Sequence, residues 1–538
     1  MSKPSKWDVI IQKIFDKRGT FLAATELIDL LCEEQSISRA YARQTIKRSV
    51  ERKVIKNSHP FTFKNGQYIY MRVDDFLSLE TLIKISKKYK PPMYRLLSLL
   101  NEEKKILSLY EARKAAATPV ENMERYNLTR LDEEIKELIN HNIIAVVKDG
   151  ERGIDYIIAK ELEGSDVLSG LMRNHYEKMR LDSLFMPDII RWLKEHNFID
   201  SNLLFYRRID NPSFGTKHND FLWDAYSYTN TTGFSINTGK EDKQTLVVLD
   251  VIIHRNYLKE DLDAFYSRIQ SVRHSTHGEA RKILPIIFFV EADIQVKKEI
   301  NRLKLLNFSL QNIFGTKVTE LVTKLDEIQK TLASAEPVEE KSEEVIEKVE
   351  NSLKLMDQTG HMENFNNLKG DLFESLMYVI VANLYPHNSR IGHSKYFKPF
   401  EYDIIVQLDT EVIVIELKGF KNTTIINLGD NKTSNTVKWF FGKTFPHAKK
   451  LYTMPNPPFS YDKTKVKGCY ITSANFSDEA KEWLENTNNT RIKPTNLDCY
   501  YDRKKLLKLI KTHENLESLR ASTSFVKILE RYYLKQED

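Results

Sequence analysis

The chain contains the run Glu401-Tyr402-Asp403-Ile404-Ile405-Val406-Gln407-Leu408-Asp409-Thr410-Glu411-Val412-Ile413-Val414-Ile415-Glu416-Leu417-Lys418, which decides the fold of its C-terminal part. Two apolar stretches, 404–408 and 412–417, flank a polar break at 409–411, and this pattern predicts a β-hairpin. Because side chains alternate between the faces of a strand, Val414, Glu416 and Lys418 should share one face. A carboxylate and an ammonium on an apolar strand are costly to bury without partners. A divalent cation and a phosphate are suitable partners, so the run predicts a functional site.

Length and composition indicate a folded protein of several domains. A chain of 538 residues is too long for one ordinary core, so we expect three or four domains. The hydrophobic content of 41% is typical of globular proteins. The net charge of +6 permits nucleic-acid binding without requiring it, because opposite charges are interspersed.

Cysteine spacing and apolar runs exclude several protein classes. Cys32, Cys469 and Cys499 are far apart, so we predict neither a zinc site nor a disulfide framework. The sequence after Met1 lacks the apolar segment of a signal peptide, and no apolar run is long enough to cross a bilayer. We therefore expect a cytoplasmic protein with no membrane contact.

Residues 1–75 resemble a winged-helix domain. Amphipathic patterns at 7–16, 25–33 and 38–52 precede two strand patterns, at 61–63 and 68–71, joined by an Asn-Gly turn. A basic third helix suits contact with DNA phosphates in the major groove. The alternative is an ordinary solvated helix face. The candidate nucleic-acid contacts are Arg39, Arg43, Lys47 and Arg48 on the third helix and Lys64 at the tip of the wing.

Residues 76–165 repeat this pattern with the opposite charge. Helical patterns at 92–100, 108–116 and 129–140 precede a hairpin pattern at 143–158. The third helix is acidic, which should repel a phosphate backbone. We therefore predict a second winged-helix-like domain that docks on protein.

Residues 166–333 show a mixed α/β pattern that leaves two interpretations open. Helical patterns at 186–195, 258–272 and 296–305 alternate with strand patterns at 245–253 and 283–290. Asp224 and Asp250 lie near strands in the same order as the acids of the C-terminal domain. However, no acid-x-lysine pair accompanies Asp250. The domain is either a degenerate relative of the C-terminal domain or an unrelated α/β domain with two ordinary aspartates. Residues 334–352, rich in Glu and Lys, should form an acidic linker, exposed or as a charged helix.

Residues 353–538 surround the opening run with further elements. The helical pattern at 368–384 is apolar almost all round and is interrupted by Glu374. Glu374 either pairs with Lys369 at a groove edge or points toward a metal site. A helical pattern at 435–450 supplies two more candidate nucleic-acid contacts, Lys438 and Lys443. Strand patterns at 466–473 and 499–501 and helical patterns at 477–483 and 503–511 complete an α/β domain.

The order of these elements resembles the PD-(D/E)XK phosphodiesterase superfamily, which has the restriction-endonuclease-like αβββαβ core. The run Ile471-Thr-Ser-Ala-Asn-Phe-Ser-Asp-Glu-Ala is similar to the strand–helix step of Mrr-type members. The resemblance covers about residues 360 to 510, and Tyr402 departs from the proline usual before the first acid. It implies four catalytic residues, Glu374, Asp403, Glu416 and Lys418. Hard oxygen ligands from Asp403, Glu416 and the Leu417 carbonyl would bind Mg²⁺ or Mn²⁺.

The sequence therefore predicts a Mg²⁺-dependent DNA endonuclease, in restriction or anti-phage defence. No Walker-type phosphate loop is present, so a translocating ATPase or helicase would be a separate subunit. One site cuts one strand, so a double-strand break would need a homo-oligomer, a partner or two visits. The alternative is a non-catalytic DNA-binding regulator or scaffold subunit of a defence, repair or transposition complex.

Overall fold

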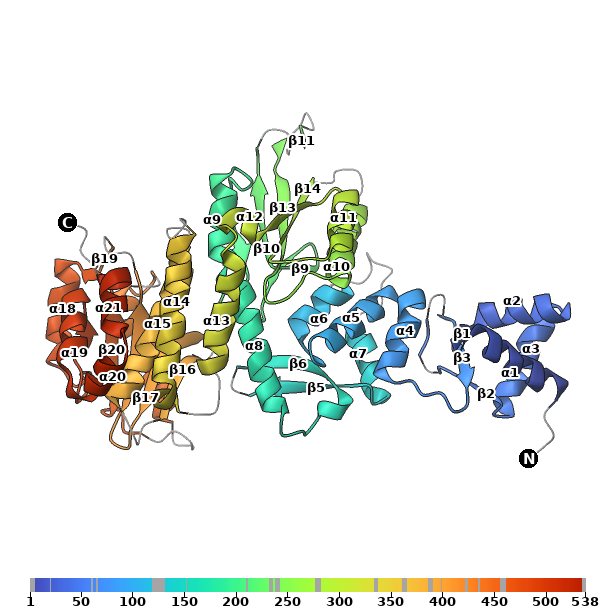
Figure 1. Ribbon diagram of the computed structural model, residues 1–538, viewed down its shortest axis with the longest axis horizontal. Coiled ribbons are helices and arrows are strands. Elements are labelled where there is room, and N and C mark those ends of the chain that lie inside the picture. The colour runs from blue at the N-terminus through green and yellow to red at the C-terminus, as the bar shows by residue number, and fades with distance from the viewer. Residues whose placement is uncertain are drawn as a thin grey trace.

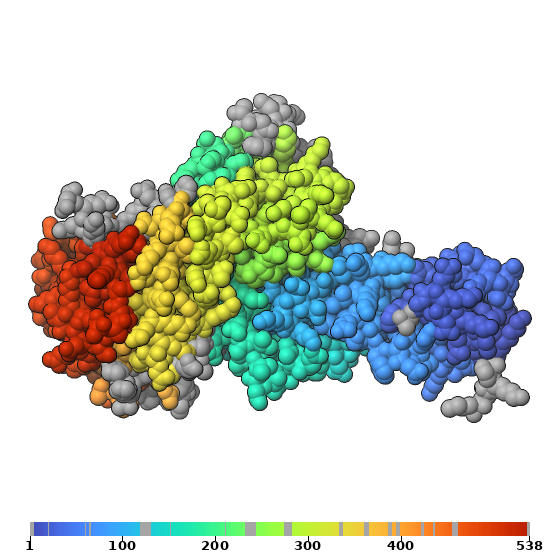
Figure 2. All heavy atoms as spheres, viewed as in Figure 1, coloured from blue at the N-terminus to red at the C-terminus, as the bar shows by residue number. Residues whose placement is uncertain are grey.

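The computed structural model shows a multidomain α/β protein (Figure 1). Two N-terminal modules extend away from a larger body formed by the middle and C-terminal domains (Figure 2). No helix in the ranges below combines the length and apolar content needed to cross a bilayer. The structure describes residues 5–19, 21–59, 61–63, 66–118, 131–150, 152–209, 211–231, 236–237, 242–275, 282–332, 337–359, 365–385, 390–397, 399–420, 424–433, 436–454 and 461–534.

The first module (residues 6–72) contains three helices and a small antiparallel sheet of order β1-β3-β2. The expected strand at 61–63 is wrong: β3 pairs with residues 55–57, and Phe63 forms only an isolated bridge with Gln67. The reason is that Phe61 and Phe63 pack into the core of the second module. The elements are α1 (Lys6–Arg18), β1 (Phe21–Ala23), α2 (Ala24–Gln35), α3 (Arg39–Glu51), β2 (Ile55–Asn57) and β3 (Ile69–Arg72).

The second module (residues 79–162) repeats the same element order after an additional helix, α4 (Leu79–Tyr89). Its sheet has the order β4-β6-β5, and the expected hairpin is present as β5 and β6. The Ser108 side chain caps α6, as Ser38 caps α3 in the first module. The elements are α5 (Pro91–Glu102), β4 (Ile106–Ser108), α6 (Leu109–Ala116), α7 (Leu131–Asn140), β5 (Ile144–Asp149), β6 (Ile154–Ala159) and a 3₁₀ turn (Lys160–Leu162).

The middle domain (residues 168–332) is a five-stranded sheet of order β15-β14-β13-β10-β7 with helices on its faces. Strands β7, β10 and β13 are antiparallel, whereas β13, β14 and β15 are parallel. The elements are α8 (Leu168–Leu184), α9 (Met186–Glu195), β7 (Phe205–Tyr206), β8 (Thr216–His218), β9 (Phe221–Trp223), β10 (Ala225–Thr229), β11 (Ile236–Asn237), β12 (Asp242–Lys243), β13 (Thr245–Ile252), α10 (Lys259–Ser275), β14 (Ile283–Phe289), α11 (Ile294–Arg302), β15 (Leu306–Ser309), α12 (Leu310–Phe314) and α13 (Val318–Leu332).

The C-terminal domain (residues 366–534) has a sheet of order β16-β17-β18-β20-β22, antiparallel through β18 and parallel beyond it. The helix expected over 435–450 is instead built in three parts around a π-helical turn (Phe440–Thr444). The other elements are α15 (Asn366–Leu384), β16 (Arg390–Phe397), β17 (Phe400–Gln407), β18 (Val412–Lys418), β19 (Ile425–Ile426), α16 (Val437–Trp439), α17 (Phe445–Tyr452), β20 (Val466–Thr472), β21 (Asn475–Phe476), α18 (Asp478–Asn488), β22 (Tyr500–Tyr501), α19 (Arg503–Thr512), α20 (Glu517–Ser522), α21 (Phe525–Leu529) and a second π-helical turn (Glu530–Leu534).

Residues 334–352 were expected to form an exposed linker or a charged helix. Their described part forms a helix, α14 (Ser342–Gln358), preceded by a 3₁₀ turn (Val338–Lys341), but this helix is packed and not exposed. Its buried residues Val345 and Val349 belong to one hydrophobic cluster that also contains Val251 of the middle sheet and Ile415 of the C-terminal sheet. Apolar residues at helical spacing within the Glu/Lys-rich stretch give α14 this buried face. Figure 1 shows α8, α13, α14 and α15 side by side, so a layer of helices joins the two sheets through a continuous core.

A buried charged cluster joins the second module to the middle domain. His254 Nδ1 lies 2.9 Å from Asp182 Oδ2, and its Nε2 lies 2.9 Å from Glu103 Oε1. Arg255 donates to the same Glu103 oxygen at 2.6 Å. Burial alone would lower the pKa of His254, but the two carboxylates raise that pKa to about 9. His254 is therefore protonated at neutral pH and links the two parts of the chain.

We expect His254→Gln to destabilise the protein in a pH-dependent manner. The pKa of folded His254 is above its ordinary value, so the contribution is complete below about pH 6.5 and is lost as pH rises through about 9. From this shift the wild type should exceed the variant by about 3 kcal/mol of unfolding free energy at about pH 6 and approach it by about pH 10. Urea unfolding across this range measures it. His196→Gln, at the exposed histidine that follows α9, is the control, and a gap independent of pH would contradict the prediction.

Candidate active site

The candidate site lies where β17 separates from β18. The ladder between these strands pairs residues 404–407 with 412–415, and one further step in the same register places Asp403 opposite Glu416. At that step Asp403 Oδ2 accepts a hydrogen bond from the Leu417 N–H at 2.6 Å. A side-chain carboxylate thus substitutes for a backbone acceptor at the end of the ladder. Glu416 stays fixed from the other side by the parallel ladder between β18 and β20.

The structure brings Asp403, Glu416 and Lys418 together. Lys418 Nζ lies 2.8 Å from Glu416 Oε1 and 3.6 Å from Asp403 Oδ2. The three side chains are between 13% and 17% exposed, so solvent screens their charges only weakly. Burial raises the pKa of Glu416 to about 7, although Lys418 acts in the opposite direction. Burial alone would lower the pKa of Lys418, but the two carboxylates hold it well above its ordinary value, so the ammonium stays charged.

Glu374 comes from α15, which packs against β18. Burial and the negative charge of Asp403 raise the pKa of Glu374 well above its ordinary value, and Lys418 opposes them. Glu374 is therefore within electrostatic reach of the other site residues. Lys369, the alternative partner of Glu374, places its ammonium 5.4 Å from the centre of the Tyr533 ring.

The charge of the site suits a cation. Glu374, Asp403 and Glu416 contribute three negative charges when ionised and Lys418 one positive charge, which leaves −2. Within the described part of the chain, no group of three or more His, Cys, Asp or Glu side chains is arranged to hold a metal ion. Mg²⁺ commonly uses one or two carboxylates and keeps several waters, so the oxygens of Asp403 and Glu416 fit such an ion. A ligand role for the Leu417 carbonyl stays a prediction.

Tyr470 is a site residue that sequence reasoning missed. It lies on β20 directly beside Glu416 in the parallel ladder. Its hydroxyl is buried and has no hydrogen-bond partner among the residues described. Burial raises the pKa of Tyr470, so the hydroxyl keeps its proton. Because an unpaired buried hydroxyl is costly, a bound water or ligand oxygen would complete its hydrogen bonding.

The predicted nucleic-acid contacts lie on two separate parts of the molecule. Arg43, Lys47 and Arg48 are exposed on α3, and Arg39 is exposed but pairs with Asp29. The first module stands at one end of the molecule, far from the C-terminal domain (Figure 2). Lys443 is exposed in the π-helical turn and Lys438 is half-buried in α16. Lys64 lies outside the described residues.

Comparisons of the chain with protein-family models, with curated proteins and with solved structures gave no match. The chemistry of the candidate site is therefore inferred from its own geometry. That geometry consists of two facing carboxylates, an ammonium between them, a third carboxylate in electrostatic reach and an unpaired tyrosine hydroxyl.

We expect Gly419→Ala to displace α15 from the site. A Cβ added at Gly419 would lie 2.7 Å from Phe373 Cβ, next to Glu374, so the helix or the strand must shift. Such overpacking should lower the unfolding free energy by about 1–3 kcal/mol.

Gly370→Ala on the same helix is the matched control, because its Cβ would meet only the Gly419 carbonyl at 3.8 Å. That substitution should raise stability by about 0.5–1 kcal/mol, since alanine is the better helix former. Urea unfolding measures both variants. Equal effects of the two substitutions would show that the approach of α15 to Gly419 is not tight.

Proposed function

We propose that this protein is a metal-dependent nuclease that hydrolyses DNA phosphodiester bonds at the site of Asp403, Glu416 and Lys418. The observation that carries the proposal is the facing pair of carboxylates at the end of the β17–β18 ladder, with the Lys418 ammonium between them. The element order α15, β16, β17, β18, α17, β20 supports a restriction-endonuclease-like core of the PD-(D/E)XK type. Glu374 on the first helix of that core supports it further.

Each side chain has a chemical role in this proposal. Hydrolysis requires neutralisation of charge at the scissile phosphate and a water in line with the leaving oxygen. The Lys418 ammonium stabilises the negative charge on the phosphate and orients the attacking water. Glu374, whose pKa burial and Asp403 raise well above its ordinary value, can orient that water. The Tyr470 hydroxyl can donate to a phosphate oxygen.

A divalent ion completes the chemistry. Mg²⁺ or Mn²⁺ held by Asp403 and Glu416 would supply Lewis acidity and lower the pKa of bound water. Three carboxylates against one ammonium favour its binding, which is coupled to release of the protons that the raised pKa values of Glu374 and Glu416 retain. Asp403 is held for this role by the Leu417 N–H.

DNA binding by the first module follows from the exposed basic residues of α3. The acidic first turn of α7 supports the second module as a protein-docking module. We propose a role in restriction or anti-phage defence in the cytoplasm, with DNA as substrate. An ATPase or helicase subunit would supply any translocation, and a homo-oligomer would supply the second cut.

A second candidate function is a non-catalytic DNA-binding regulator or scaffold. The observation that favours it is the ion pair between Lys418 and Glu416 in the absence of a preformed three-ligand metal group among the described residues. Incubation of the protein with supercoiled and single-stranded DNA in Mg²⁺, Mn²⁺ and EDTA separates the two functions, because only the nuclease cuts in a metal-dependent manner.

We expect Asp403→Asn and Lys418→Met each to reduce metal-dependent plasmid nicking by about a hundredfold or more, since each removes charge stabilisation of the transition state. Nicking is measured on agarose gels and folding by circular dichroism. Asp409→Asn, on the exposed turn of the same hairpin, is the control and should cut as the wild type does. Undiminished nicking by a folded Asp403→Asn protein would refute the assignment.

We expect replacement of Arg43, Lys47 and Arg48 by alanine to weaken DNA binding and its salt dependence. The slope of log K against log salt should become shallower by about 0.9 for each phosphate that is no longer neutralised by a basic side chain. Fluorescence anisotropy with the Asp403→Asn protein measures the slope without cleavage. Lys13→Ala, an exposed lysine on α1, is the control. An unchanged slope in the triple variant would exclude α3 from the interface.

A further inference from the structure

The middle sheet repeats the C-terminal sheet strand by strand. In both, three antiparallel strands are followed by two parallel ones, in the orders β7-β10-β13-β14-β15 and β16-β17-β18-β20-β22. Ala225 pairs with Leu249 in the middle ladder as Ile404 pairs with Ile415 in the C-terminal one. The repetition therefore extends from the order of strands to their register.

The acidic residues occupy the same places in the two sheets. One further step in the middle ladder puts Asp224 opposite Asp250, as Asp403 faces Glu416. The Val251 N–H donates to Asp224 Oδ2 at 2.8 Å. In the C-terminal domain the Leu417 N–H donates to Asp403 in the same way, and Val251 and Leu417 each follow the second acid of their pair. Two unrelated surface aspartates would have no reason to share this backbone bond.

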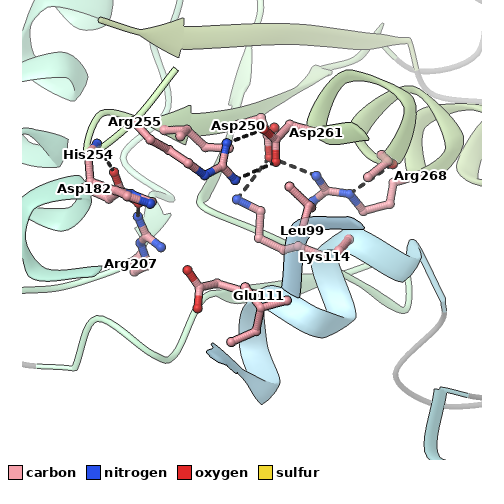
Figure 3. Close-up of a pocket in the computed structure, with 14 residues that line it drawn as sticks. Leu99, Glu111, Lys114, Asp182, Arg207, Asp250, His254, Arg255, Asp261 and Arg268 are labelled. Atoms are coloured by element: carbon pink, nitrogen blue, oxygen red, sulfur yellow. Dashed lines mark hydrogen bonds and ion pairs between the residues drawn. The ribbon is translucent and has the colours of Figure 1, made fainter. Parts of the chain in front are cut away.

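The lysine of the middle site comes from a different part of the chain. The residue two positions after Asp250 is the buried Ile252, where the C-terminal domain has Lys418. Instead Lys114 of α6 places Nζ 2.5 Å from Asp224 Oδ2. The same Nζ lies 3.1 Å from Asp250 Oδ1 (Figure 3). An ammonium from the second module thus lies between the two carboxylates.

The charge balance of this site differs from that of the C-terminal site, because its carboxylates are matched by cations. Arg268 Nη2 lies 2.8 Å from Asp250 Oδ1, and Arg207 Nε lies 3.5 Å from Asp224 Oδ1. Lys114 and the two arginines therefore neutralise the two carboxylates, and Arg207 is shared with Asp182, whose Oδ2 lies 3.1 Å from its Nη2. None of these side chains is more than 10% exposed, and a metal ion would have to displace the cations that already pair with the carboxylates. The cavity beside them, of about 30 Å³, has room for water and not for a nucleotide.

The helix that carries Lys114 fits closely against the middle domain. Tyr110, one turn earlier on α6, donates its hydroxyl hydrogen to Asp224 Oδ1 at 2.7 Å. Its ring lies against Gly215, where an added Cβ would come within 2.1 Å of a ring carbon. The contact around the carboxylates is therefore steric as well as ionic.

We propose that the middle domain is an inactive copy of the C-terminal domain, whose carboxylate pair binds Lys114 in place of a metal ion and thereby anchors the second module. In naming the C-terminal copy as the active one, this inference rests on the proposed function. The anchoring itself does not require cleavage, so it is tested by stability. One consequence is that each chain carries a single cleavage site.

Lys114→Met should lower the thermal unfolding midpoint by about 5 °C or more, because it leaves buried carboxylate charge without its nearest cation. Adding Asp224→Asn to that variant should recover most of the loss, since the unpaired charge is removed. Lys105→Met, whose exposed partner is Glu161, is the control and should melt as the wild type does. If Lys114→Met yields no soluble protein, the double variant decides. A double variant no more stable or soluble than the single one overturns the proposal.

Metal binding and cleavage assays test whether the carboxylate pair of the middle domain is inactive. In an Asp403→Asn/Glu416→Gln background, Mn²⁺ alone should leave the melting midpoint unchanged, and a rise would overturn the occupation of the site by Lys114. Asp250→Asn in the otherwise wild-type chain, assayed well below its midpoint, should retain plasmid nicking within about twofold. A loss as large as that of Asp403→Asn would make the middle domain a working site. Absence of nicking by the wild type would refute the proposed function. The stability comparison of the Lys114→Met and Asp224→Asn variants would stay valid, because it does not depend on cleavage.

Discussion

Two carboxylates that face each other at the end of an antiparallel ladder repel, and the neutralisation of this repulsion organises much of the molecule. Desolvation makes the repulsion larger than it would be in water, so each pair requires a cation within a few ångströms. The C-terminal pair keeps Lys418 from its own strand and retains excess negative charge. The middle pair is surrounded by Lys114, Arg207 and Arg268, which neutralise its charge. One backbone arrangement thus carries the candidate site in one domain and an ion-paired contact with the second module in the other.

The two α/β domains act as one body because their helices share a core. Cluster residues from α8, α13, α14 and α15 form one continuous apolar layer between the sheets. Arg180 of α8 pairs at 3.0 Å with Asp371, one turn before Glu374 on α15, and both side chains are buried. A buried ion pair of this kind fixes the relative position of two helices, since separation would leave unpaired charge. The helix that carries Glu374 is therefore held from the middle domain as well as from its own sheet.

Local patterns predicted most elements but not all of their partners. The apolar alternation at 404–408 and 412–417 correctly indicated the hairpin, and the helical pattern at 186–195 coincides with α9. The strand expected at 61–63 was wrong because Phe61 and Phe63 are buried by another module, a contact that no local window contains. For residues 334–352 the dominance of charged residues left two forms open, an exposed linker and a charged helix. The apolar face of α14 is buried because the two sheets lie on either side of the helix, and the composition of the segment does not show this packing.

Local pattern alone established the proximity of Glu416 and Lys418, because alternation along one strand places residues two apart on the same face. It also identified Asp403 and Glu374 as the acids most suited to join them. Only the tertiary structure decided that Tyr470 lies beside Glu416, and that Lys114 lies between Asp224 and Asp250. Those contacts join residues dozens to more than a hundred positions apart, and strand register and domain packing, rather than local periodicity, bring them together.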